Sequence, residues 1–110
     1  MAPLYPVDWR FVVDDAFLFA RRAAAQRHSW DLVSADLPSD LPLEMVEALP
    51  LWWAIADRFV VSTICRHNFP GEPNMDDLPE PPQGWYYANM IQRSEYRGGM
   101  WWLVSERAPS

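Results

Sequence analysis

Lysine is absent from this sequence of 110 residues, and all nine of its basic residues are arginine. Without lysine, Schiff-base chemistry and phosphate binding by a P-loop are excluded. Fifteen acidic residues give the chain a net charge of −6. Non-specific nucleic-acid binding is therefore not expected, because it needs a basic surface that neutralises phosphates.

Cysteine and long apolar runs are also scarce. Cys65 is the single cysteine, so an internal disulfide is excluded. The start of the chain has no apolar leader, which together with the free thiol indicates the reducing cytoplasm of a cell or of an infected host. No run reaches the roughly 18 apolar residues of a membrane-spanning helix, so no membrane partner is expected.

Glycine is limited to Gly71, Gly84, Gly98 and Gly99, and none of them lies between an expected strand and an expected helix. The Gly-rich turn that binds a nucleotide in Rossmann folds is therefore missing. Apolar residues, in contrast, are abundant, since half of the sequence is hydrophobic and seven residues are tryptophan. At this length, such a composition predicts one small domain with its own core.

The first third of the chain has the pattern of a strand–helix–strand unit. Residues 9–13, WRFVV, form a short apolar run that ends at Asp14 and Asp15. Residues 16–27 repeat apolar side chains at spacings of three and four, which predicts a helix capped by one of these acids. Residues 30–35 form the next apolar run. Two strands joined in this way are expected to be parallel, with a right-handed crossover.

Proline divides the middle of the chain. Because proline is tolerated only in the first turn of a helix, we expect one short helix near residues 43–48 and another turn or two over 50–56. Residues 59–65, FVVSTIC, are β-branched and apolar, which predicts a buried strand. Residues 68–84 contain five prolines and four acids. They predict a long acidic loop, either a solvated connector or a contact arm.

The last part of the chain predicts an antiparallel hairpin. Residues 85–92 and 100–106 are aromatic-rich, and two adjacent glycines lie between them. Together, the elements predict an α/β fold with a small Rossmann-like sheet of about five strands and flanking helices. Three strands are expected to be parallel. The hairpin is expected to place its second strand beside residues 59–65 and its first strand outside that.

The order of elements is more specific than any one of them. The strings VVDDAF, WDLVSADLP and FVVSTIC, followed by a hairpin, resemble the carboxyl-terminal half of a class I S-adenosylmethionine-dependent methyltransferase. The resemblance implies a single truncated methyltransferase-like domain over residues 1–110, with residues 68–84 as its Pro-rich acidic loop.

The resemblance also implies candidate site residues. In that family an acidic-Ala pair lies beside the adenine of the cofactor, and Asp15 and Ala16, followed by Phe17, match this pair. An acid-Pro motif lies beside the methyl donor and the substrate, and Asp36 and Pro38 match this motif.

The family also uses a Gly-rich loop after its first strand and an acid after its second, and this sequence has a counterpart of neither. We therefore expect a methyltransferase-like module without a cofactor and without catalysis. It would act by binding another macromolecule, as a homo-oligomer or with a protein partner. Two alternatives remain. One is an active methyltransferase whose S-adenosylmethionine site is completed by oligomerisation or a partner chain, and the other is a phage structural or accessory protein.

Acidic side chains gather near the ends of the predicted strands. Asp14, Asp15, Asp36 and Asp40 could together hold a hard cation such as Mg²⁺. Helix capping by two of these carboxylates is the interpretation we prefer, and we expect no metal.

Two adjacent tryptophan pairs suggest contact residues. Because neighbours in an element point in different directions, we expect one ring of each pair in the core and the other exposed, with Trp52 and Trp101 as candidates for partner contacts. Arg93 and Arg97, near the hairpin turn, could bind an acidic partner or phosphate, or form a solvated rim.

Overall fold

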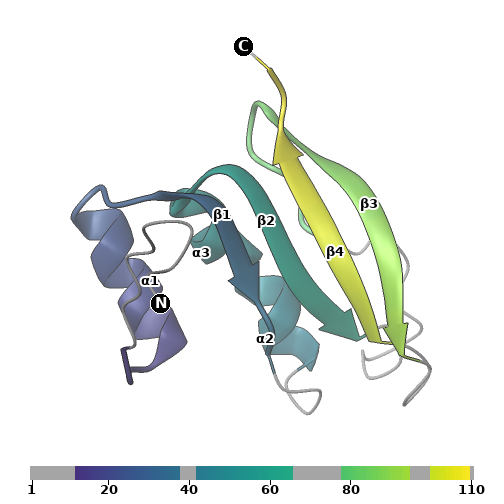
Figure 1. The fold of residues 1–110 in the computed structure, drawn as a ribbon, viewed down its shortest axis with the longest axis horizontal. Coiled ribbons are helices and arrows are strands. Elements are labelled where there is room, and N and C mark those ends of the chain that lie inside the picture. Colours follow the sequence, from purple (N-terminus) through teal and green to yellow (C-terminus); the bar gives the residue numbers. More distant parts are fainter. Residues whose placement is uncertain (1–11, 38–41, 66–77, 95–99, 110) are drawn as a thin grey trace, which may run out of the picture.

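A computed structural model describes residues 12–37, 42–65, 78–94 and 100–109. In chain order the elements are α1 (Ala16–Ala25), β1 (Trp30–Ala35), α2 (Pro42–Glu47), α3 (Leu49–Ala54), β2 (Ala56–Cys65), β3 (Trp85–Ser94) and β4 (Met100–Arg107). The strands form one mixed sheet in the order β1-β2-β4-β3 (Figure 1). β1 and β2 are parallel, and β4 is antiparallel to both β2 and β3. The α/β class, the parallel pair and the place of the last strand are therefore confirmed.

The number of strands differs from the prediction. The described part of the chain has a sheet of four strands rather than about five. Val12 and Val13, the end of the predicted strand over residues 9–13, lie outside the sheet and are exposed. The rest of that segment lies outside the described residues. Strand propensity depends on the neighbouring strand for its hydrogen bonds and packing, and no described strand lies beside Val12 and Val13.

The bounds of two elements are set by local contacts. The last helical bond of α1 runs from the backbone N–H of Gln26 to the carbonyl oxygen of Arg22. Arg27 then takes a positive φ of 55°, and the N–H of His28 donates to the carbonyl oxygen of Ala23 at 2.8 Å, which closes the helix in a left-handed turn. β2 begins at Ala56, before the predicted start, because Ala56 pairs with Trp30 across the parallel ladder.

One face of the sheet is covered by helices. Val60 and Ile64 of β2 and Leu103 of β4 share this face through the register of the ladder and are almost completely buried. They form one core cluster with Leu49 and Trp53 of α3. Figure 1 shows α2 and α3 behind the sheet. We refer to this side of the sheet as the covered face.

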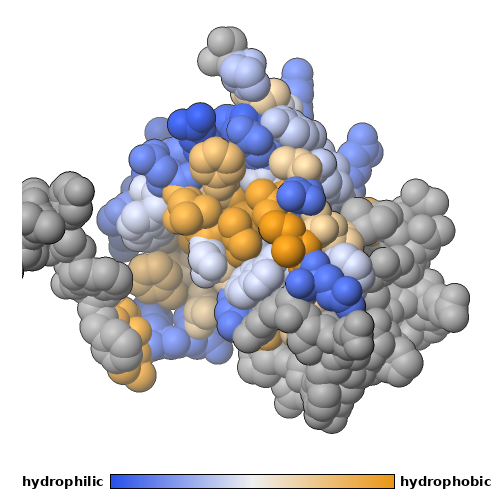
Figure 2. Space-filling model, turned by 45° about the vertical axis from the view of Figure 1, so that its right-hand side comes forward, coloured by the Kyte–Doolittle hydropathy of each residue, from blue (hydrophilic) through white to orange (hydrophobic). Residues whose placement is uncertain are grey.

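The other face carries apolar side chains without a helix over them among the described residues. The ladder pairs Leu32 with Phe59, Val61 with Val104 and Ile91 with Trp102, so these side chains lie on the opposite side from the covered face. None of them belongs to the core clusters. Figure 2 looks obliquely onto this side of the sheet, where apolar side chains gather. The apolar members of this open sheet face are Leu32, Phe59, Val61, Tyr86, Ile91, Trp102 and Val104.

Candidate functional site

A groove of about 1120 Å³ lies between α1 and β1. Among the described residues β1 pairs with β2 alone, so its other edge presents backbone N–H and C=O groups without a strand partner. We refer to this groove as the β1 edge groove. It is lined by Val12, Asp14, Ala16, Phe19, Arg22, Ala23, Gln26, His28, Trp30, Leu32, Val33, Ser34, Ala35, Asp36, Leu37, Trp52 and Ile55.

Two stripes of α1 face two different neighbours. One stripe packs on the core, where the ring of Phe17 stacks on Trp52 with 6.0 Å between the ring centroids and Ala20 is fully buried. The second stripe lines the β1 edge groove at spacings of three and four, the period of one helix face. Its apolar members are Ala16, Phe19 and Ala23, and the polar Gln26 ends it. α1 therefore presents an apolar stripe over the space beside the edge of β1.

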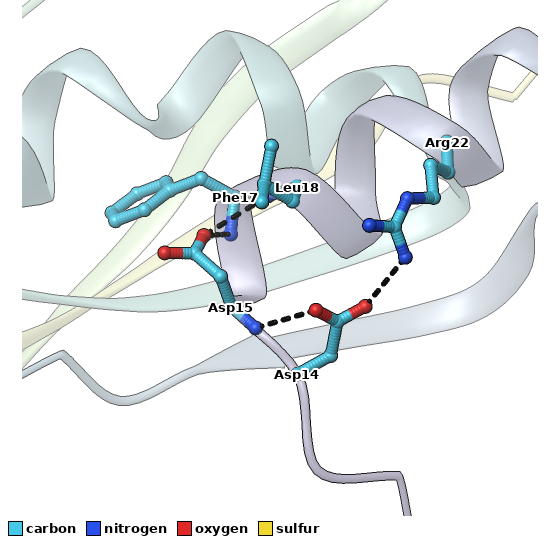
Figure 3. A network of polar contacts seen from close by, with 5 residues as sticks. All are labelled: Asp14, Asp15, Phe17, Leu18 and Arg22. Carbon is cyan, nitrogen blue, oxygen red and sulfur yellow. Dashed lines mark hydrogen bonds and ion pairs between the residues drawn. The ribbon is translucent and has the colours of Figure 1, made fainter.

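The start of α1 is held by two acids (Figure 3). The carboxylate of Asp15 accepts the backbone N–H groups of Phe17 at 2.9 Å and Leu18 at 3.0 Å, which satisfies two of the free donors at the helix start. Asp14 accepts the N–H of Asp15 at 2.8 Å and forms an ion pair with Arg22, also at 2.8 Å. The predicted cap is confirmed, and the two acids fix the position of the groove wall.

Aromatic rings lie at the other end of the groove. The ring of Trp30 stacks on His28 with 4.2 Å between centroids and on Phe19 with 5.9 Å. The backbone N–H of Trp30 donates to the carbonyl oxygen of Ile55 at 2.9 Å, which fixes the start of β1 against α3. Trp30 thus joins α1 to β1 and gives the groove an aromatic end.

The carboxyl end of β1 is tied to β2. The backbone N–H of Leu37 donates to the Oγ1 of Thr63 at 3.0 Å, and that hydroxyl donates to the carbonyl oxygen of Leu37 at 3.4 Å. Asp36 comes just before this contact, is exposed, and lines the β1 edge groove. The strand end is therefore fixed, and Asp36 is one of the residues beside the groove.

The predicted cofactor and catalytic residues are only partly brought together. Ala16 and Asp36 line the same groove, although they come from different elements. Asp15 is used as the helix cap, and Phe17 points to the core, where it stacks on Trp52. Pro38 lies outside the described residues.

The groove contains residues that the sequence reasoning missed. Phe19 and His28 were given no role, although Phe19 falls in a second apolar stripe of the helix, with Ala16 and Ala23, that the spacing would have revealed. The stacking of His28 on Trp30 has no signal in the sequence, because it depends on how the turn after α1 places the imidazole.

The expected outward ring at the first tryptophan pair is wrong. Trp52 and Trp53 are only 4% and 5% exposed. Neighbouring side chains on a helix point in different directions, and here each ring meets a different element. Trp52 stacks on Phe17 of α1, and the ring centroid of Trp53 lies 6.1 Å from that of Tyr87 of β3. Trp101 is partly buried and packs against the core cluster.

The predicted partner contacts of Arg93 and Arg97 stay predictions. Arg97 and the side chain of Arg93 lie outside the described residues. In the part of the chain that is described, no group of three His, Cys, Asp or Glu side chains is placed to hold a metal ion. The helices described are all too short, or not apolar enough, to cross a membrane.

The β1 edge groove combines a strand edge, apolar and aromatic walls, and few charged groups. A strand edge offers a regular row of backbone hydrogen bonds, and the side chains around it can select the residues of an added strand. Known proteins give no guide to its occupant: no protein-family model matches the chain, and no curated protein or solved structure shows significant similarity to it.

Proposed function

We propose that the protein is a non-catalytic, methyltransferase-like binding module that binds an extended segment of another protein on the edge of β1. The observation that carries this proposal is the strand edge lying beside an apolar stripe of α1 across a groove of about 1120 Å³. The groove follows β1 along its length, since its lining includes Trp30 and the residues from Leu32 to Leu37. A polypeptide segment fits it better than a small ligand.

Strand addition explains how such a groove would bind. The backbone of the added segment pairs with the N–H and C=O groups of β1, and alternate side chains enter the groove. Phe19 and Leu32 supply exposed apolar surface on the two walls, and Trp30 supplies an aromatic end. The module would work as a homo-oligomer or with a protein partner.

An NMR titration tests the groove. The probe is a peptide that copies residues 7–13, VDWRFVV, because this segment has the alternation of a strand. We expect saturable shift changes at the amides of β1 and α1 in the intact chain. Phe19→Glu should abolish them, whereas Leu18→Glu, at the neighbouring exposed position of α1 that does not line the groove, should leave them unchanged. Shift changes that miss β1, or that persist in Phe19→Glu, would refute strand addition.

A second candidate is an active S-adenosylmethionine-dependent methyltransferase whose site is completed by a partner chain. It is supported by Ala16 and Asp36, which match the adenine and acid-Pro motifs of that family and line one groove. Isothermal titration of the chain with S-adenosylmethionine separates the two candidates. We expect no saturable heat, because the Gly-rich turn and the ribose acid are missing. Saturable micromolar binding would favour the methyltransferase instead.

A further inference from the structure

The open sheet face is a second surface of the protein, and among its apolar members only Leu32 also lines the β1 edge groove. Its apolar side chains come from all four strands. Ile91 of β3 and Leu32 of β1, on the two outer strands, are 50% and 53% exposed. Val61 and Val104, paired at its centre, are half-buried. Contiguous exposed apolar surface of this kind usually marks a contact with another molecule.

Two charged side chains beside this face, among the described residues, have partners within the chain. The guanidinium of Arg58 lies over the ring of Phe59, 5.0 Å from its centroid. The hydroxyl of Tyr86 donates to the carboxylate of Glu106 at 2.8 Å. Phe59 and Glu106 pair across the ladder, so both contacts lie toward one end of the face. A charged partner would have to compete with these contacts, so the face favours a partner that is itself apolar.

The size of the face can be compared with the needs of an interface. Four strands about 4.8 Å apart and roughly eight residues long span about 19 by 26 Å, or about 500 Å². Two such faces in contact bury about 1,000 Å² in all, which is the lower limit for a specific interface. The open sheet face is therefore just large enough for a dimer interface, and the same face of a second copy has the same length and width.

We infer that two copies of this chain pack open sheet face against open sheet face. The contact is a two-layer β-sandwich around a two-fold axis, the commonest symmetry of homo-oligomers, with the strands of the two sheets crossing at about 30°. This inference deepens the proposed binding role by naming a second copy as one partner. It depends on neither the β1 edge groove nor the methyltransferase resemblance.

The net charge of the chain predicts how salt should change the stability of this dimer. Each copy carries a net charge of −6, so the copies repel each other while their apolar faces attract. Salt screens the repulsion and leaves the apolar attraction, so the dimer should become tighter as salt is added. A contact that depended on ion pairs would become weaker instead.

Analytical ultracentrifugation of the full chain over a dilution series, at low and at high salt, tests the inference. We expect a concentration-dependent dimer that tightens with salt. Ile91→Glu should weaken it by about tenfold or more, because a carboxylate would be buried without a partner. The matched control is Leu18→Glu on α1, which is 45% exposed and lies away from this face; it should leave the dimer unchanged. Circular dichroism of both variants checks that they are folded.

The opposing outcomes are distinct. A strictly monomeric chain at all concentrations overturns the dimer. Dimerisation that survives Ile91→Glu but is lost in Phe19→Glu overturns the face as its site and assigns it to the β1 edge groove. A dimer that weakens with added salt also overturns the apolar contact. Since the peptide titration above does not depend on dimerisation, the groove and the dimer can fail separately.

Discussion

The two faces of the sheet are made from alternate residues of the same strands, yet they differ in how deeply their side chains are buried. On the covered face Val60 and Leu103 are fully buried beneath α2 and α3. One position further along each strand, Val61 and Val104 are only half-buried on the open sheet face. Both pairs are aliphatic. Hydrophobicity alone therefore does not distinguish a core position from a contact surface, and the placement of the helices does.

The largest expected effect comes from removing a helix side chain that fills the covered side. Trp52→Ala should lower the free energy of unfolding by about 3–5 kcal/mol, because it leaves a cavity between Phe17 and the core. Urea denaturation followed by circular dichroism measures this loss. Trp52→Phe keeps a ring in the site and should lose less. A loss below about 1 kcal/mol for Trp52→Ala would mean that this ring is not a core residue.

The sharpest test of the comparison uses two neighbours in β4. Leu103→Ala should cost about 2–5 kcal/mol of stability, because the side chain is fully buried on the covered face. Val104→Ala should cost less than about 1 kcal/mol in the monomer, since its side chain is already partly in water. Denaturation is measured at high dilution to avoid self-association. Equal losses would show that the two faces are equally covered.

Two adjacent tyrosines extend the comparison to pH. Burial raises the pKa of Tyr87, whose hydroxyl donates to the carbonyl oxygen of Pro79 on the covered side, to about 12. The unfolded chain loses this proton near pH 10, so the folded state holds more protons between pH 10 and 12. The contribution of Tyr87 to the free energy of unfolding is therefore fully present below pH 10 and is lost as the pH rises toward 12.

Tyr87→Phe should flatten that decline, as measured by urea denaturation between pH 9 and 12. The control is Tyr86→Phe. The hydrogen bond to Glu106 raises the pKa of Tyr86 as well, but this side chain lies exposed on the open sheet face, where water screens the interaction. Most of the decline should persist in this variant. A flatter curve for Tyr86→Phe than for Tyr87→Phe would reverse the comparison.

The smallest expected effect lies outside both faces, at the start of α1. Asp15→Ala should cost about 1 kcal/mol, since it removes the acceptor for the N–H groups of Phe17 and Leu18. Asp14→Ala should cost less, because it mainly removes an ion pair with an Arg22 side chain that is 63% exposed. Thermal unfolding of both variants checks the order, and a larger loss for Asp14→Ala would contradict it.

Local patterns in the sequence predicted much of this fold. Asp14 and Asp15 before an amphipathic run predicted an acidic cap for α1, and the apolar runs predicted the parallel pair of β1 and β2. The hairpin and the place of β4 beside β2 followed from the same signals. These features depend on hydrogen bonds and side-chain periods within a few residues, or on simple rules for connecting neighbouring strands.

Only the tertiary structure decided which apolar surfaces are used and which are left open. Whether Trp52 faces the core or a partner depends on where α1 brings Phe17, and no short-range pattern contains that distance. The β1 edge groove likewise depends on the distance between α1 and β1. The apolar stripe of Phe19 can line a groove only because α1 lies at that distance. The sequence by itself determined most of the elements and their order, because their causes are local; the exception is the predicted strand over residues 9–13, whose described end, Val12 and Val13, lies outside the sheet. The placement of the elements was decided by packing among distant residues.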